Sequence, residues 1–466
     1  MGKIIAYYAM PHPPIIIPEV GRGQEEKIKE TSDACNKVAD EISNIEPDTI
    51  IIVTPHGPVF GDAIALSYES KIKGNLGKFR ASDIAYELDI NLGLTKKIMD
   101  YSKSENILTV GLTEESAATY GINYELDHGT IVPLYFIHKK YPHYKIVHIT
   151  YGMLSQIELY NFGIQIKKAV EDCDTNAVFI ASGDLSHKLL EEGPYNYSPH
   201  GEKFDNELVS LLEKGNVVDV FNMSHTTIKE AAECGLRSYY VMLGAMNNLE
   251  IKGNLLSYEG PFGVGYCVFN FSTSKSKKNV YDQLVDYIEN RYNDKLKNED
   301  PYVRLARESL IHYLEKGNYI DIPSYVTDEL KEVKRAVFVS LKKEGNLRGC
   351  IGSTSPTMEN VAKEIIKYAV EAGVRDPRFL PVRIEELKMI DFSVDILTEP
   401  RKATRDELDP KKYGVIVRSG LKSGLLLPDL EGVESIEHQL DIVLQKAGID
   451  SYDEYSIEKF EVLRHK

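Results

Sequence analysis

The sequence predicts two domains, an N-terminal α/β domain with a mainly parallel sheet and a C-terminal α+β domain. Short apolar runs recur in the first 271 residues, and a polar turn and a helical stretch follow each of them. A polar, basic stretch then interrupts the pattern. The 466 residues also exceed the roughly 100–200 residues of one ordinary domain. We therefore expect domains at 1–271 and 280–466, joined by a linker at 272–279.

The predicted strands of the first domain are continuous in apolar character rather than alternating. Strands of this kind are covered by helices on both faces of the sheet. They are Ile4–Ala9, Thr49–Thr54, Ile146–Thr150 and Val178–Ala181, with a closing strand at Pro261–Phe271.

Longer stretches with helical periodicity separate these strands. Alternation of strands and helices favours a parallel sheet with helices on both faces. The predicted helices are Glu25–Ile45, Asp89–Lys103, Leu154–Cys173, Gly201–Lys214 and Thr227–Asn248.

The linker is predicted from the stretch STSKSKK at 272–278, which has no apolar period. Beyond it, helices and strands no longer alternate regularly, which indicates an α+β domain. The predicted helices are Val280–Asn293, Tyr302–Lys316 and Thr357–Ala372, and the strands are Ala336–Lys342, Gly349–Ile351 and Ile390–Leu397.

Composition restricts the class of partner. The chain carries 55 Lys and Arg against 71 Asp and Glu, a formal charge of −16, which argues against binding to nucleic acid. Prolines break the opening apolar run at Pro11, Pro13 and Pro14, so we expect neither a signal peptide nor a membrane span. The five scattered cysteines fit a reducing compartment, and we expect a cytoplasmic protein.

Three histidines directly follow predicted strands: His12, His56 and His187. In an open α/β sheet, ligands bind beyond the carboxyl ends of the strands. Proline or glycine flanks His12 and His56 and fixes the backbone there, as a metal ligand requires. A single such histidine would more often be an ordinary polar residue, but three at equivalent places favour a site.

A third metal ligand is expected in the segment EAAECGLR, where Glu233 offers a carboxylate and Cys234 a thiolate. Two imidazoles and a carboxylate form the non-haem Fe(II) arrangement. The residues leave open which neighbour points inward. The alternative is a buried helix over 231–246 in which Cys234 packs as a small apolar side chain.

Two further residues could act on a bound substrate. His187, three residues after Asp184 in SGDLSH, is a candidate general acid and base that the carboxylate orients. The alternative is a turn stabilised by capping. His128 could donate a hydrogen bond to substrate or dioxygen, or it could simply begin a helix beside Asp127. Four further histidines of this domain lack a strand-end position and are expected to be structural or surface residues: His143, His148, His200 and His225.

A second site is conceivable in the C-terminal domain around Cys350. Gly349 and Gly352 leave the backbone open near this thiol, and Arg348 could stabilise its thiolate or pair with an anionic ligand. The alternative is a tight turn with Cys350 packed inward. Arg375, Asp376 and Arg378 could equally form a structural ion-pair cluster.

The motifs of the first domain resemble those of the class III extradiol dioxygenase superfamily of the LigB type, and within it the Memo-like proteins. The motifs are MPHPP, PHGP, DHGTIVPL, SGDLSH and ECGLR, and the resemblance spans residues 1–271. It implies Fe(II) held by His12, His56 and a third ligand from Glu233 or Cys234, with His187 as acid and base. It further implies O2 and an aromatic diol as substrates. Some Memo-like members place cysteine where the enzymes have glutamate.

The second domain resembles the AMMECR family through LRGCIG at 347–352, VRDPRFLPV at 374–382 and GLLLP at 424–428. Domains of this family are fused to Memo-like domains and associated with a radical-SAM protein in the AmmeMemoRadiSam grouping, which implies such a protein as partner. We therefore carry an iron-dependent dioxygenase and, as alternative, a non-catalytic metal-binding or substrate-presenting module working with a radical-SAM protein. A scaffold without metal is a third, weaker hypothesis. A homo-oligomer is compatible with each of them.

Overall fold

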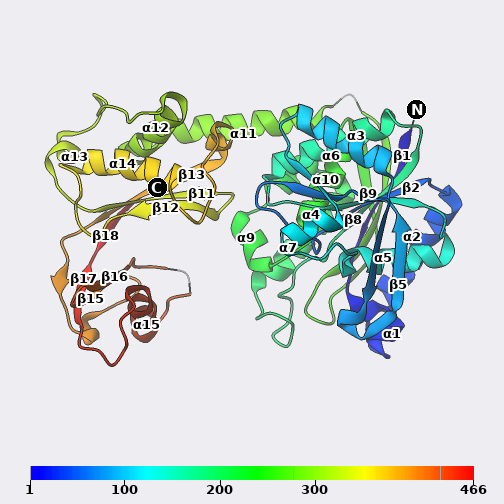
Figure 1. Ribbon diagram of the computed structural model, residues 1–466, viewed down its shortest axis with the longest axis horizontal. Coiled ribbons are helices and arrows are strands. Elements are labelled where there is room, and N and C mark those ends of the chain that lie inside the picture. Colours follow the sequence, from blue (N-terminus) through cyan, green and yellow to red (C-terminus); the bar gives the residue numbers. More distant parts are fainter. Residues whose placement is uncertain (1, 277, 431) are drawn as a thin grey trace. The chain divides into compact units, whose positions relative to one another are not determined.

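The computed structural model describes residues 2–276, 278–430 and 432–466 (Figure 1). The chain separates into two compact units, Met1–Asp286 and Tyr287–Lys466. The boundary between them falls inside helix α11, Val280–Lys297.

The N-terminal unit is built on an eight-stranded mixed sheet with the strand order β6-β3-β7-β2-β8-β1-β10-β9. The four central strands β7, β2, β8 and β1 are parallel, and β10 and β9 continue the sheet antiparallel. Its strands are β1 Lys3–Met10, β2 Thr49–Thr54, β3 Ile64–Ser67, β6 Thr109–Leu112, β7 Lys145–Thr150, β8 Asn176–Ser182, β9 Leu249–Glu259 and β10 Tyr266–Lys275. A separate hairpin consists of β4 Lys71–Leu76 and β5 Ala81–Asp89.

Helices cover both faces of this sheet, and the predicted α/β class is confirmed (Figure 1). Helices α3, α6 and α10 pack together, and α2 packs on α5. The helices are α1 Pro18–Gly21, α2 Lys29–Ile45, α3 Leu92–Ser104, α4 Glu114–Thr119, α5 His128–Lys140, α6 Gln156–Glu171, α7 Pro199–Lys214, α8 Val217–Phe221, α9 His225–Ala231 and α10 Leu236–Ala245. Short 3-10 helices lie at Pro14–Ile16, Glu25–Ile28 and Gly77–Phe79.

Two apolar cores, one on each face, explain the continuous apolar runs of the central strands. In β2, Ile51 and Val53 belong to one core, whereas Ile50 and Ile52 belong to the other. Because successive side chains of a strand point to opposite faces, a strand buried on both sides requires apolar residues at every position.

The predicted single helix Thr227–Asn248 is wrong. The segment forms α9 and α10, and Ala232 between them adopts a left-handed backbone conformation with φ 53°. The carbonyl of Asp184 accepts hydrogen bonds from the backbone N–H groups of Cys234 at 3.4 Å and Gly235 at 3.0 Å. These bonds to the loop after β8 replace helical bonds, so tertiary contacts override the local helical pattern.

Several predicted boundaries also differ from the structure. The closing strand expected from Pro261 begins at Tyr266, and the helix expected from Thr357 begins at Val361. The helix expected from Asp89 begins at Leu92, because Asp89 ends β5. Strand β10 continues to Lys275 and so includes the first half of the linker expected at 272–279, in which Lys277 lies outside the described residues.

The C-terminal unit is α+β, as predicted. It contains two four-stranded antiparallel sheets, with orders β12-β11-β13-β18 and β14-β17-β15-β16. Its strands are β11 Val337–Lys343, β12 Asn346–Gly352, β13 Ile390–Leu397, β14 Arg401–Lys402, β15 Gly414–Ser419, β16 Lys422–Leu426, β17 Ser456–Phe460 and β18 Val462–His465. Its helices are α12 Pro301–Lys316, α13 Asp328–Glu332, α14 Val361–Val374 and α15 Ile436–Ala447, with 3-10 turns at Ile384–Met389 and Arg405–Glu407. Helices α12 and α14 pack on the first sheet, and α15 packs on the second.

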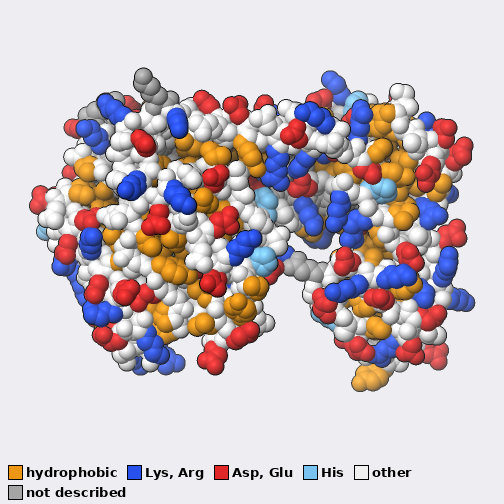
Figure 2. All heavy atoms as spheres, turned by 180° about the vertical axis from the view of Figure 1, so that it is seen from behind, with side chains coloured by type: hydrophobic (Ala, Val, Ile, Leu, Met, Phe, Trp, Pro, Cys, Tyr) orange, Lys and Arg blue, Asp and Glu red, His pale blue; other side chains and the backbone are white. Residues whose placement is uncertain are grey.

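Acidic and basic side chains are interspersed on the face of the N-terminal unit seen in Figure 2. Among the described residues, no helix combines the length and apolar character that crossing a membrane requires.

Candidate metal centre

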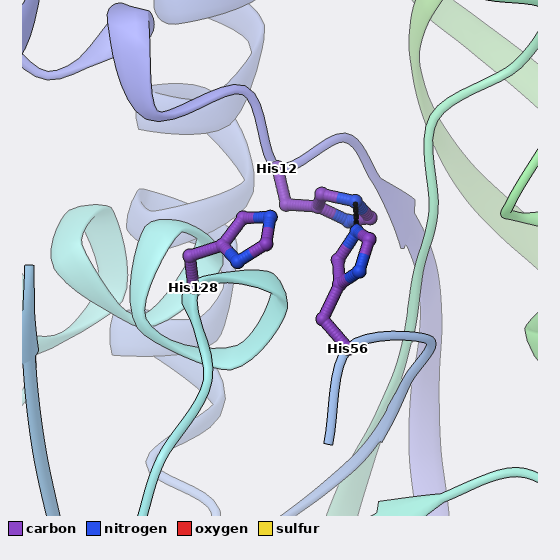
Figure 3. A group of neighbouring side chains, drawn as sticks. All are labelled: His12, His56 and His128. Atoms are coloured by element: carbon purple, nitrogen blue, oxygen red, sulfur yellow. Dashed lines mark hydrogen bonds between the residues drawn. The ribbon is translucent and has the colours of Figure 1, made fainter. Parts of the chain in front are cut away.

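Three histidines from separate elements converge at the carboxyl ends of the parallel strands (Figure 3). His12 follows β1, His56 follows β2, and His128 is the first residue of α5. The Nε2 atoms of His12 and His56 lie 2.9 Å apart, and the rings of His56 and His128 stack with centroids 4.1 Å apart. His128, which the sequence suggested as a hydrogen-bond donor to substrate, thus lies within a cluster of potential metal ligands.

His12 also belongs to a second cluster, which adds a carboxylate and a thiol. The Sγ of Cys234 lies 3.5 Å from Nε2 of His12, and Oδ2 of Asp184 lies 3.8 Å from the same atom. The other carboxylate oxygen of Asp184 accepts the backbone N–H of His12 at 2.8 Å. His12 is therefore the residue that the two clusters share.

A buried hydroxyl orients the His12 ring. Ser182 Oγ donates to the carbonyl of Gly129 at 2.5 Å, and it lies 2.9 Å from Nδ1 of His12. Because the single hydroxyl proton is used at Gly129, the Ser182 oxygen must accept a hydrogen bond from the N–H at Nδ1 of His12. In the neutral ring, this bond places the proton on Nδ1 and leaves Nε2 of His12 unprotonated. An unprotonated ring nitrogen is the one that binds a metal.

Pro133 supports this arrangement from within α5. A helical residue at this position normally donates its N–H to the carbonyl four residues earlier, that of Gly129, but proline has no N–H. The carbonyl of Gly129 is therefore available to Ser182.

A second buried network fixes the other two histidines. Asp127 caps the N-terminus of α5, next to His128, and accepts a hydrogen bond from Thr54 Oγ1 at 2.6 Å. The same Thr54 oxygen accepts the backbone N–H of His56 at 3.3 Å. The second oxygen of Asp127 lies 3.2 Å from His148 Nε2. One carboxylate thus links the end of β2 to the start of α5.

Burial keeps the imidazoles of the first cluster neutral. It lowers the pKa of His12 well below the usual range, and the neighbouring His56 lowers it further. The pKa of His56 is lowered by burial, and that of His128 falls to about 3 through burial and the adjacent His12 and His56. Neutral imidazoles are the form in which histidine binds metals.

The acidic members of the second cluster hold their protons more strongly than usual. Burial raises the pKa of Asp184 to about 6, although the backbone N–H of His12 opposes the shift. Burial, followed by the charge of Asp184, raises the pKa of the Cys234 thiol well above its ordinary value. A metal bound here would therefore displace a proton from Cys234.

Glu233 and Cys234, which the sequence left as alternatives, face different surroundings. The Glu233 carboxylate accepts the backbone N–H of Leu236 at 2.7 Å, in the first turn of α10. Burial raises its pKa to about 7. Among the described residues, Glu233 belongs to neither cluster, whereas the Cys234 thiol belongs to the second.

His187 lies beside the clusters without joining either of them. Its ring contacts Tyr195 edge-on with centroids 5.8 Å apart, and its Nδ1 is buried without a hydrogen-bond partner among the described residues. Burial lowers its pKa, and the charge of Asp184 opposes this effect. The Asp184 carboxylate, expected to orient His187, instead hydrogen-bonds His12.

The separations between His12 Nε2 and its neighbouring donor atoms fit a first-row metal ion. Donors bound to a single ion at ~2.0–2.3 Å lie roughly 3–4 Å apart, which agrees with the separations around His12 Nε2. Imidazoles suit iron, copper and zinc, and thiolate favours the softer of these ions. The site therefore fits Fe(II) without being restricted to it.

A cavity of about 280 Å³ opens beside the histidines. His56 and His128 form part of its wall, together with Pro58, Phe79 and Ile122. An engineered cavity of roughly 150 Å³ holds benzene, so this volume suits one substituted aromatic ring. The amide side chains of Asn75 and Asn123 and the ion-paired Lys78 and Glu125, 3.0 Å apart, supply polar groups to the same wall.

Arg348 and Cys350, predicted as a second site, both have partners within the C-terminal unit. Arg348 binds the buried carboxylate of Glu386 at 3.0 and 3.1 Å, so its guanidinium is already paired. A Cβ on Gly349 would lie 2.1 Å from the carbonyl of Ala372, so this glycine permits close packing of β12 on α14. The Cys350 thiol accepts a hydrogen bond from Ser340 at 3.2 Å.

The ion-pair interpretation holds for two of the three charged residues that follow α14. Asp376 pairs with Arg378 at 2.6 Å and also accepts the backbone N–H of Cys350 at 2.9 Å. This pairing lowers the pKa of Asp376 to about 2, chiefly through the hydrogen bond from Arg378. Arg375 pairs separately with Glu371 at 2.6 Å.

Sequence reasoning missed the polar residues that support the histidines. His148, expected to be a structural or surface residue, is buried, holds Asp127 and bonds Ser67 at 2.8 Å through its other nitrogen. The available signal was a histidine inside the otherwise apolar run KIVHIT. Ser182 ends β8 in the same way, as a hydroxyl after five buried apolar residues.

Comparison with known families gives two matches along the chain. The family model of the catalytic LigB subunit of aromatic ring-opening dioxygenase matches residues 6–269. The AMMECR1 family model matches residues 303–465. The first match includes every residue of the two clusters.

Two relatives differ in the share of this chain that they match. The protein CA_C1420 of Clostridium acetobutylicum is 54% identical over 461 residues, covering 99% of this chain and 98% of the relative. A Thermotoga maritima protein is 47% identical over 172 residues, which is 36% of this chain and 98% of its own length. Among solved structures, the uncharacterised protein PH0010 of Pyrococcus horikoshii is 33% identical, with a TM-score of 0.33 over 35% of this chain and 88% of its own.

Proposed function

Because this chain belongs to the family of the catalytic LigB subunit of aromatic ring-opening dioxygenases and carries an AMMECR1 domain, we propose that its N-terminal unit is a metal-dependent oxygenase of the extradiol type. The proposed substrates are O2 and an aromatic diol, and the proposed metal is Fe(II). The observation that carries the proposal is the position of His56 and His128, which belong to the ligand cluster and also line the ring-sized cavity.

His12, which belongs to both clusters, would hold the metal together with His56 of the first cluster and Cys234 of the second, with Asp184 beside them. When bound, Fe(II) supplies coordination positions for dioxygen and for the two hydroxyls of a diol. Ser182 keeps the Nε2 lone pair of His12 directed into the site, and Asp184 fixes the backbone of His12. These contacts preorganise the ligand and lower the cost of ordering it when metal binds.

The cavity wall supplies substrate positioning. Phe79 contacts His128 edge-on with ring centroids 5.1 Å apart, which gives an apolar wall for an aromatic ring. The neutral His128 can exchange a hydrogen bond with a substrate hydroxyl, and His187 is the proposed acid and base. Its unpartnered Nδ1 supports this role, because a buried polar nitrogen is normally paired unless it serves a function.

Oxygen uptake tests the proposal directly. Full-length protein loaded anaerobically with Fe(II) should consume about one O2 per catechol added, because ring opening of this type inserts both oxygen atoms into the diol. The His56→Ala variant should show no uptake above buffer. The proposal is rejected if iron binds stoichiometrically and no diphenol supports uptake.

A second candidate function is a metal-binding or substrate-presenting module that works with a radical-SAM protein. The observation that favours it is the thiol of Cys234, since a thiolate ligand suits tighter binding with less open chemistry than a carboxylate. Capture of the tagged full-length chain from its native cells should then recover a radical-SAM protein. Recovery of none, under conditions that preserve the bound metal, would count against this function.

A further inference from the structure

Three exposed apolar side chains and the half-buried Phe60, here called the apolar rim, lie on or beside chain segments that line the cavity: Val59, Phe60, Tyr120 and Met153. Tyr120 is 56% exposed, Met153 51% and Val59 44%. Phe60 and Tyr120 contact each other edge-on with centroids 5.3 Å apart, and the backbone N–H of Met153 donates to the carbonyl of Phe60 at 2.9 Å. These two contacts hold the three chain segments together.

The apolar rim continues from the wall of the cavity. Pro58 and Ile122 line the cavity, and they stand one and two residues from Val59 and Tyr120 in the chain. A molecule whose ring occupies the cavity would therefore extend over the rim. The cavity itself has room for little more than one substituted ring, so the rim has no role for an unsubstituted diol.

Charges around the site disfavour an anionic substituent. Lys78, the cation of the cavity wall, is paired with Glu125 at 3.0 Å. The segments of the rim carry negative charge nearby, with Asp62 after Phe60 and Glu114 and Glu115 in the first turn of α4. A carboxylate at the rim would meet like charges, whereas an uncharged apolar group would bury surface that is otherwise exposed to water.

We infer that the substrate is an uncharged aromatic diol with an apolar substituent, whose ring enters the cavity and whose substituent lies on the apolar rim. This inference rests on the proposed function, because it assigns the ring to the cavity beside the metal ligands. It adds a specificity subsite formed by side chains that do not touch the metal.

Binding of two probes to the Fe(II)-loaded full-length chain tests the inference under anaerobic conditions. Isothermal titration should give 4-hexylcatechol a dissociation constant at least tenfold lower than that of catechol, since each buried CH₂ strengthens binding about fourfold. The variants Tyr120→Ser and Met153→Ser should each lose much of this gain and bind catechol unchanged. Tyr452→Ser, at a tyrosine that is 96% exposed in the C-terminal unit, is the matched control and should keep the whole gain.

The outcomes separate the two proposals. Equal affinity for both probes overturns the inference and leaves the proposed function standing. The inference is also overturned if both rim variants still bind 4-hexylcatechol more tightly than catechol by the native factor, because the hexyl group is then bound elsewhere. If neither probe binds, the proposed function fails and the inference fails with it.

Discussion

The thiol of Cys234 lies 3.5 Å from Nε2 of His12, although 222 residues separate the two in the chain. The contact depends on the break between α9 and α10, which places Cys234 in a short loop rather than on the side of a continuous helix. The loop is tied to the turn after β8, because the backbone N–H of Asp184 donates to the Cys234 sulfur at 3.3 Å. The break is therefore part of the candidate metal centre.

Substitution of Gly183 should disrupt this loop. A Cβ on Gly183 would lie 2.0 Å from the Cα of Gly235, so Gly183→Ala forces two backbone segments apart. We expect a loss of at least about 2 kcal/mol in the free energy of unfolding, measured with urea. Gly61→Ala is the control, since its Cβ would meet no atom within 4 Å, and it should change stability little. Equal effects of the two substitutions would contradict the account.

Removal of the Ser182 hydroxyl should lower the affinity of the site for Fe(II). Without it, Nδ1 of His12 loses its acceptor, and the ring is no longer held with Nε2 unprotonated. Loss of such a supporting hydrogen bond typically reduces metal affinity about 10–100-fold. Competitive titration of Fe(II) against a chelator should show this for Ser182→Ala. Ser309→Ala, which removes another buried hydroxyl bonded to a backbone carbonyl, should leave the affinity unchanged.

Asp205 should make stability depend on pH. Burial raises its pKa to about 7, although hydrogen bonds from Tyr258 and the backbone of Ser186 oppose the shift. An unfolded aspartate has a pKa of about 3.9. The folded carboxyl thus keeps its proton where the unfolded one has lost it, so stability falls as pH rises from about 4 to about 7.

The Asp205→Asn variant should remove this contribution. The free energy of unfolding should be measured with urea at pH 5, 6 and 7. The value for the variant, relative to that of the native chain, should rise by up to about 1.4 kcal/mol per pH unit. Asp62→Asn, at an exposed carboxylate, is the control, and its free energy of unfolding should differ from that of the native chain by the same amount at each pH. A difference between Asp205→Asn and the native chain that stays constant with pH would refute the assignment.

The parallel strands of the N-terminal sheet could be predicted because burial on both faces forces continuous apolar runs, as in β2. The strand-end positions of His12 and His56 follow from the same pattern, since parallel strands end at one edge of the sheet. The hairpin of β4 and β5 was not predicted. It lies outside the main sheet and pairs locally, so its residues carry no continuous apolar run.

The third ligand could not be chosen from sequence because the choice depends on a tertiary contact. The segment around Cys234 has helical periodicity on both sides, and the carbonyl of Asp184, distant in the chain, accepts backbone hydrogen bonds that would otherwise continue the helix. Likewise, Ser182 becomes important through Gly129, whose carbonyl is available because Pro133 lies four residues later in α5. Neither relation is visible in the spacing of residues along one segment.

The most direct test of the metal centre compares Fe(II) affinity in Cys234→Ala and Glu233→Gln. Both variants are prepared as full-length protein and titrated anaerobically against the same chelator. Our account predicts that Cys234→Ala loses at least about 100-fold in affinity, because a ligand is removed, whereas Glu233→Gln stays within a few-fold of the native chain, since the amide oxygen still caps α10. Loss of affinity in Glu233→Gln with full binding in Cys234→Ala would contradict the account.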